Sequence, residues 1–178
     1  MPKIKIKLKK NKGIVFWITG LSGSGKTSIS KRILPFIKEK FGPTLAFSGD
    51  ELRNILNYKK YNRKDRLHIG YIYSSLCQNI SNKQINVVID VAGLFDQIRE
   101  NNRKKIKNYC EIYIKSTVNK IIENGKKKIY FNKRNKIWGV NINPEFPKQS
   151  HIVINNYFDR PLSTITKELK NKILKTIK

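Results

Sequence analysis

One short segment constrains the fold of this chain more than any other. Residues 20–27 read Gly-Leu-Ser-Gly-Ser-Gly-Lys-Thr, a full match to the phosphate-binding pattern G-x-x-x-x-G-K-[ST]. An apolar, β-rich run over 13–19 precedes this segment, and residues 28–34 follow it with helical spacing. A strand, a glycine-rich loop and a helix in this order predict backbone N–H groups that wrap a polyphosphate. A chance Gly/Ser turn is the weaker interpretation, because it would not require both neighbours.

The chemistry of this loop assigns roles to its residues. We expect Lys26 to reach the β- and γ-phosphates as a catalytic group and the Thr27 hydroxyl to ligate Mg²⁺. The predicted ATP-binding residues are Gly20, Leu21, Ser22, Gly23, Ser24, Gly25, Lys26 and Thr27. Asp90 ends the most apolar predicted strand, 85–91, and is a second candidate metal residue that would act through water. An acid that caps a helix or ends a strand is the alternative for Asp90.

Strands and helices are predicted to alternate along the whole chain. Beyond the first strand, strands are expected over 44–47, 85–91, 110–114 and 152–154, and helices over 26–40, 65–81, 96–108, 117–124 and 161–177. This alternation predicts an α/β P-loop NTPase fold, a mostly parallel sheet with helices on both faces in three layers. A ligand would then lie at the carboxyl ends of the strands. Pro35 predicts a kink or an early end in the first helix.

The length and composition favour one domain. A chain of 178 residues can bury a sizeable core, and no linker or repeat divides it. Residues 1–12 are a basic arm or an added edge strand, and the basic, aromatic region over about 124–148 is expected to form a lid. No run reaches the roughly 18 apolar residues of a membrane span. Cys77 and Cys110 are expected to be reduced core residues of a cytoplasmic protein.

The net charge of +26 is extreme for this length. Such a charge is typical of nucleic-acid binding, and a nucleic-acid-binding protein that retains the loop is the alternative from another class. We favour a compositional bias toward Lys, Asn and Ile, because the charges form no single block and no nucleic-acid-binding signature accompanies them. Salt-sensitive, nonspecific contact with nucleic acid is expected under both interpretations.

A second group of candidate residues follows the strand at 44–47. The segment Gly49-Asp-Glu-Leu-Arg53 would place an acid and a guanidinium across the cleft from the phosphate loop. Asp50 can orient an acceptor hydroxyl as a second catalytic residue, or hold Mg²⁺ through water. Arg53 can bind an anion with two parallel hydrogen bonds. A helix N-cap acid beside a surface arginine is the simpler alternative.

These motifs together resemble the adenylylsulfate kinase family over roughly residues 13–155. Ser48–Arg53 is similar to the family's Asp-Gly-Asp-Asn-Val-Arg, Lys127–Tyr130 to its Lys-Gly-Leu-Tyr lid motif, and residues 139–147 to its Gly-Ile-Asp-Ser-Pro-Tyr-Glu-Ala-Pro. The resemblance implies a homodimeric, Mg²⁺-dependent enzyme. It would transfer the γ-phosphoryl group of ATP to the ribose 3′-hydroxyl of an anionic nucleotide.

The resemblance also implies which residues bind the acceptor. Asp50 would orient its hydroxyl, Arg53 and Arg66 would bind its anionic tail, and Arg99 and Lys127 match further basic positions of the family. A solvated surface position is nearly as plausible for Lys127, because lysine is abundant throughout the chain. Aromatic residues that could stack on a base, or simply belong to the core, are Tyr130, Phe131 and Trp138.

The departures from the family pattern gather on the acceptor side. Ser48 replaces the first acid of Asp-Gly-Asp, His68–Ile72 replaces Glu-Asn-x-Arg-Arg, and Ala92–Asp96 replaces Ile-Ser-Pro-Phe-Arg. Asp96 in particular would repel an anionic tail. We therefore expect the ATP chemistry to be retained and the acceptor to be the variable part. Adenylylsulfate is the expected acceptor. Cytidine diphosphoramidate, the substrate of a similar kinase of capsule synthesis, is the alternative.

Overall fold

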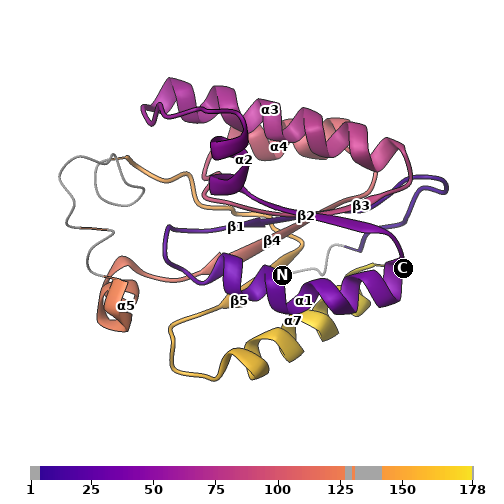
Figure 1. Cartoon of the computed structure of the whole chain (residues 1–178). Helices are drawn as coiled ribbons and strands as arrows, with labels where there is room; N and C mark the ends of the chain where they lie inside the picture. The colour runs from indigo at the N-terminus through magenta and orange to yellow at the C-terminus, as the bar shows by residue number, and fades with distance from the viewer. Residues whose placement is uncertain (1–4, 127–129, 131–141, 178) are drawn as a thin grey trace.

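The computed structural model describes residues 5–126, 130 and 142–177. Its centre is a five-stranded parallel sheet in the order β2-β3-β1-β4-β5 (Figure 1). The strands are β1 Val15–Thr19, β2 Thr44–Ser48, β3 Asn86–Val91, β4 Tyr109–Lys115 and β5 Ile152–Asn155. The predicted parallel α/β fold is confirmed.

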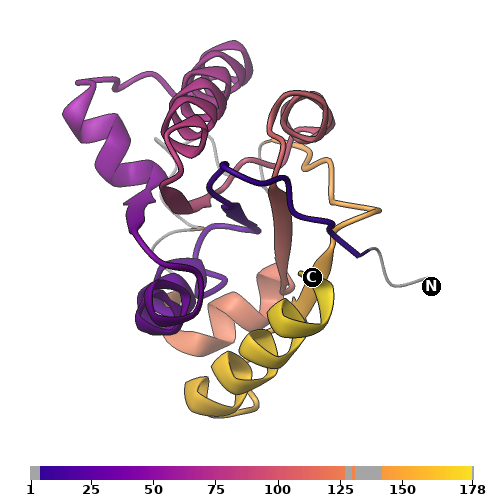
Figure 2. The same cartoon turned by 90° about the vertical axis from the view of Figure 1, so that its right-hand side faces the viewer.

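Helices cover both faces of this sheet. Figure 2 shows α3 (Arg63–Asn82) and α4 (Asp96–Lys105) on one side, and α1 (Lys26–Phe41) and α7 (Leu162–Thr176) on the other. Two shorter helices, α2 (Gly49–Ile55) and α5 (Val118–Ile121), follow β2 and β4 at the carboxyl edge. A further turn, Ile122–Lys126, extends α5.

The central strand explains why the sheet needs both layers. All five residues of β1 are buried, as expected of a parallel strand covered on both faces. Trp17 packs in the apolar cluster beneath α3 and α4, whereas Phe16 and Ile18 pack in the cluster beside α1 and α7. Successive side chains of a strand point to opposite faces, so one strand contributes to both cores.

Three details differ from the sequence-based expectations or resolve them. Helix α1 runs through Pro35 to Phe41, so it does not end early, because the surrounding packing outweighs the one missing N–H donor. Helix α3 begins at Arg63 and ends at Asn82, slightly longer at both ends than the predicted helix over 65–81. Ile6, in the N-terminal segment, forms one isolated parallel bridge with Ile177 beyond α7.

Candidate active site

The phosphate loop depends on close approaches that only glycine permits. Gly25 is the N-cap of α1 and has a φ of 88°, in the left-handed region that favours glycine. A Cβ atom at Gly25 would lie 2.7 Å from the side-chain nitrogen of Asn156, and one at Gly20 would lie 2.5 Å from the Ile114 carbonyl oxygen. The loop can therefore lie against β4 and the end of β5 without side chains in between.

Lys26 is folded back over the loop that contains it. Its ammonium donates to the Leu21 carbonyl oxygen at 2.7 Å, and the residue is only 8% exposed. Burial lowers the pKa of Lys26 to about 8, while the nearby charges of Asp90 and Asp50 act in the opposite direction. A buried ammonium with so little anionic compensation is suited to receive the charge of bound phosphates.

Asp90 lies directly beside the first turn of α1. Its two carboxylate oxygens accept hydrogen bonds from the Thr27 hydroxyl at 2.7 Å and the Ser30 hydroxyl at 2.9 Å. In the sheet, Asp90 pairs in register with Ile18 of β1 and Ser48 of β2. A threonine hydroxyl and a carboxylate at the end of the loop are hard oxygen donors of the kind that Mg²⁺ prefers. The residues therefore fit a magnesium ion, which Thr27 and Asp90 would help to hold.

Asp50 lies near both Lys26 of the phosphate loop and Arg66 of α3. Ser48, not Asp50, is the N-cap of α2, and it forms a capping box with Glu51 through contacts of 3.1 and 3.2 Å. This leaves the exposed Asp50 carboxylate without a capping role. Its charge opposes the lowering of the pKa of both Lys26 and Arg66, so the acid faces both halves of the site.

Arg53 and Arg66 lie over the same aromatic ring. Their guanidinium carbons are 4.6 and 5.3 Å from the centre of the Tyr61 ring. Arg53 donates to the carbonyl oxygens of Tyr58 at 3.3 Å and Lys60 at 2.9 Å, and Arg66 donates to that of Tyr61 at 2.8 Å. Burial and the charge of Arg53 lower the pKa of Arg66. Two like charges held this close form a site that a bound anion would stabilise.

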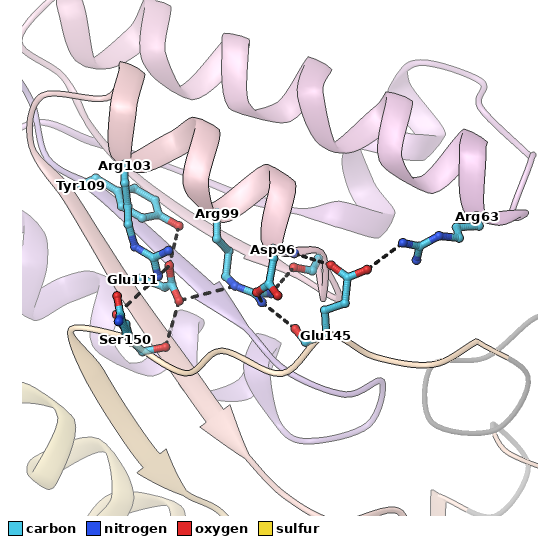
Figure 3. Close-up of polar contacts among 10 residues, drawn as sticks. Arg63, Asp96, Arg99, Arg103, Tyr109, Glu111, Glu145 and Ser150 are labelled. Carbon is cyan, nitrogen blue, oxygen red and sulfur yellow. Dashed lines mark hydrogen bonds and ion pairs between the residues drawn. The ribbon is translucent and has the colours of Figure 1, made fainter. Parts of the chain in front are cut away.

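Arg99 occupies a different place from the one expected. Its side chain is 1% exposed, it forms an ion pair with Asp96, and its Nε lies 3.8 Å from the Glu111 carboxylate (Figure 3). It also donates to the carbonyl oxygens of Gly93 at 3.4 Å and Glu145 at 2.6 Å. These contacts do not support the expected contact of Arg99 with an acceptor. They also give Asp96 a partner, so its charge is balanced locally.

Comparison with known proteins identifies the family. The model of the adenylylsulphate kinase family matches residues 12–155. This chain belongs to the adenylylsulphate kinase family. It is 34% identical over 152 residues to a cytidine diphosphoramidate kinase of Campylobacter jejuni, covering 83% of this chain and 88% of that one. It is 29% identical over 159 residues to an adenylyl-sulfate kinase of Clostridium acetobutylicum, covering 86% and 80%.

The solved structures agree on the fold of this family member. An APS kinase of Mycobacterium tuberculosis, solved in complex with AMPPNP and APS, superposes with a TM-score of 0.81 at 21% identity. The match covers 92% of this chain and 98% of that one. The family and its relatives make this protein a small-molecule kinase with a P-loop, as predicted. Within the described residues, none of its helices combines the length and apolar character needed to span a membrane.

Two side chains form hydrogen bonds that support the phosphate loop, and the sequence analysis predicted neither contact. Asn156, buried just after β5, donates from its amide to the Ser24 carbonyl oxygen at 2.9 Å. The Tyr130 hydroxyl donates to the Ser22 carbonyl oxygen at 2.6 Å. Tyr130 was expected to stack on a base or to join the core, and it is 6% exposed. Lys127 and the aromatic candidates Phe131 and Trp138 lie outside the described residues.

Glu111 is a further buried acid that the motifs did not indicate. Its carboxylate accepts hydrogen bonds from Arg103 at 2.7 Å, Ser150 at 2.9 Å and Tyr109 at 3.3 Å (Figure 3). Burial raises the pKa of Glu111, and Arg103 and Ser150 oppose this effect. A lone acid within the apolar run 109–114 was the available signal, because a buried carboxylate in a strand requires partners.

Proposed function

We propose that this protein transfers the γ-phosphoryl group of ATP to a ribose hydroxyl of an anionic nucleotide, with cytidine diphosphoramidate as the acceptor. The observation that carries the proposal is the pair Arg53 and Arg66 on the Tyr61 ring. This pair supplies positive charge for an anionic tail on the far side of Asp50 from the phosphate loop. Under this proposal the phosphate loop would bind ATP, and the arginine pair would bind the charged tail of the acceptor.

The residues suit an in-line phosphoryl transfer. The loop amides and Lys26 would hold the β- and γ-phosphates and stabilise the charge that develops on them. Thr27 and Asp90 would hold Mg²⁺, which when bound neutralises phosphate charge. The acceptor oxygen forms a bond to the γ-phosphorus while the bond from that phosphorus to the β–γ bridging oxygen breaks and ADP leaves. Asp50 would orient the acceptor hydroxyl and take up its proton.

The choice of acceptor rests on the altered acceptor side. Ser48, His68–Ile72 and Ala92–Asp96 all differ from the adenylylsulfate kinase pattern, and Arg99 is committed to internal contacts. The phosphate loop, in contrast, keeps its full pattern. The relative named as a cytidine diphosphoramidate kinase matches at higher identity, 34%, than the adenylyl-sulfate kinase named beside it, 29%. Lys127 keeps its predicted role as a further acceptor contact.

Adenylylsulfate is the second candidate acceptor. Asp50, Arg53 and Arg66 stand where the family resemblance places its acceptor residues, and a sulfate tail would fit the same pair of guanidinium groups. The two candidates share a 5′-linked anion and differ in the base and in the tail. This difference makes a direct competition informative.

The test is ATP consumption by the purified protein with Mg²⁺ and either cytidine diphosphoramidate, adenylylsulfate or water. We expect turnover on the cytidine compound that exceeds turnover on adenylylsulfate at least about tenfold in kcat/KM, a difference of roughly 1.4 kcal/mol. The variant Asp50→Asn should lower kcat about 10²-fold with little change in either KM, because a positioned base acts in the transition state. Preference for adenylylsulfate would overturn the acceptor assignment. Hydrolysis in water alone would leave no support for either acceptor.

The remaining expectations belong to the same proposal. We propose a homodimer, a Mg²⁺ cofactor, a cytoplasmic site of action where ATP is available, and a single domain whose lid spans about residues 124–148. Light scattering after size exclusion would test the dimer. A nucleic-acid-binding function would instead give binding that survives Lys26→Met and falls steeply with salt.

A further inference from the structure

Glu145 links the first residues of two helices, α3 and α4. One of its carboxylate oxygens lies 2.7 Å from the Arg63 guanidinium, and the other accepts a 2.7 Å hydrogen bond from the backbone N–H of Asp96. Arg63 is the first residue of α3, and Asp96 is the first residue of α4. A single carboxylate therefore joins the N-termini of both helices (Figure 3). Negative charge at helix N-termini is favourable.

The backbone of Glu145 is fixed as firmly as its side chain. Its N–H donates to the Leu94 carbonyl oxygen at 3.0 Å, and its own carbonyl oxygen accepts from Arg99 at 2.6 Å. Burial would raise the pKa of Glu145, but hydrogen bonds from Arg63 and from the Asp96 N–H lower it overall. The carboxylate is therefore ionised near neutral pH and holds a defined position over the β3–α4 connection.

Arg63, the partner of Glu145, lies in the same helix turn as Arg66, one of the two arginines proposed to bind the acceptor. Arg63 also lies over the Phe95 ring, 4.8 Å from its centre. Arg66 follows in the same first turn of α3 and holds the Tyr61 carbonyl oxygen. A displacement of that turn would move Arg66 and the Tyr61 ring on which Arg53 rests.

We propose that Glu145 is a positioning residue for acceptor binding, which fixes the first turn of α3 through Arg63 and thereby sets the spacing of Arg53 and Arg66. The proposal rests on the proposed function in one respect, that the Arg53–Arg66 site binds the acceptor. Glu145 makes no contact with Lys26 or Asp90 among the hydrogen bonds of the described residues, so its effect should reach the acceptor and not ATP.

The variant Glu145→Gln removes the charge and keeps the shape of the side chain. Glu168→Gln is the control, because the Glu168 side chain is also 30% exposed and also forms ion pairs, with Arg160 and Lys172, but it lies on α7 across the sheet. With the acceptor that the wild type turns over, Glu145→Gln should raise the acceptor KM about threefold to tenfold, with kcat and the ATP KM nearly unchanged, as loss of a partly exposed charge-assisted contact would give.

Arg63→Met should raise the acceptor KM by a similar factor, and the double variant should add little, because both changes break one contact. Hydrogen exchange gives a readout that needs no acceptor: Glu145→Gln should speed exchange at the amides of 61–66 without a matching change in melting temperature. Glu168→Gln should change neither quantity.

The outcomes separate the two proposals. An unchanged acceptor KM in Glu145→Gln, or equal rises in the acceptor and ATP KM values, would overturn the positioning role. If the wild type turns over neither acceptor, the proposed function fails, and the exchange measurement alone decides this inference. Exchange over 61–66 equal to that of the wild type would then refute it.

Discussion

The proposed ATP side and the proposed acceptor side of this kinase are formed by different kinds of structural element. The ATP side consists of a backbone loop, a Lys26 that is 8% exposed and an Asp90 that is 6% exposed, all set against the buried β1 and β3. On the proposed acceptor side, the equally buried Arg53 (8% exposed) and the partly exposed Arg66 are held by carbonyl oxygens and by the Tyr61 ring of the connection between α2 and α3, which is largely exposed. We therefore expect phosphate binding to depend on a frame set by the sheet, and acceptor binding to depend on a surface connection that can vary without disturbing the sheet.

The largest expected effect comes from a change on the ATP side. Lys26→Met should lower kcat about 10³-fold, because it removes the charge that stabilises the transferred group. Lys31→Met on the same helix changes an exposed lysine and is the matched control, which should retain activity. A coupled ATPase assay with saturating acceptor measures both. Activity within tenfold of the wild type in Lys26→Met would remove the distinction between the two sides.

The same lysine should lower the free energy of unfolding of the nucleotide-free protein. The unfolded chain keeps the Lys26 proton up to about pH 10.5, whereas in the folded protein burial lowers the pKa to about 8. Between these values the unfolded state binds more protons, so the free energy of unfolding should rise with pH. Below pH 8 we expect Lys26→Met to be more stable than the wild type by up to about 3 kcal/mol, and this gain should shrink toward pH 10.5.

Urea unfolding of both proteins at several pH values, without nucleotide or Mg²⁺, measures this difference. The other lysines titrate in both proteins and cancel. A stability difference that does not vary with pH would show that Lys26 is not destabilised by burial.

Asp90→Asn tests whether Asp90, on the ATP side, helps to bind Mg²⁺. The change weakens the acceptor of the Thr27 and Ser30 hydroxyl groups and removes a negative charge. We expect the Mg²⁺ concentration needed for half-maximal activity to rise about tenfold to a hundredfold, as for other residues that orient a metal ligand. The control is Asp159→Asn, an exposed acid after β5. An unchanged Mg²⁺ requirement in Asp90→Asn would exclude the metal role.

The comparison also explains what could be predicted from the sequence. The loop, β1 and α1 are contiguous, and their chemistry is local, so a motif and its neighbours predict the strand, the turn and the placement of Lys26 and Thr27. The parallel sheet follows from alternating buried strands and amphipathic helices. The location of Arg53 near the carboxyl edge of the sheet could be predicted because it comes shortly after the end of a strand.

The supporting contacts could not be predicted in this way. Asn156 reaches Ser24 across 132 positions of the sequence, and Glu145 reaches Arg63 across 82. Such pairs depend on the order of strands and the return path of the chain, which no local pattern encodes. Arg99 illustrates the consequence: its family position favoured an acceptor contact, but partners from the β3–α4 connection, α4, β4 and Glu145 occupy it.

Arg53→Met tests the proposed acceptor side. It removes one of the two guanidinium groups over Tyr61, and we expect the acceptor KM to rise about tenfold, as for loss of a charge-assisted hydrogen bond. The ATP KM should not change. Arg53→Lys should not restore the wild-type value, because an ammonium neither stacks on the ring nor forms two parallel bonds. Arg32→Met, an exposed change on α1, is the control. A rise in the ATP KM of Arg53→Met would contradict the separation of the two sides.

The smallest expected effect concerns Tyr130, a side chain that reaches the phosphate loop from beyond α5. The Tyr130 hydroxyl donates to the Ser22 carbonyl oxygen at 2.6 Å, and burial raises its pKa to about 12, so it stays a neutral donor. Tyr130→Phe should raise the ATP KM about threefold, the typical worth of one such hydrogen bond, and leave the acceptor KM unchanged. Tyr71→Phe, on the exposed face of α3, is the control. A change in the acceptor KM instead would mean that Tyr130 belongs to the acceptor side, where its ring could stack on the base of the acceptor.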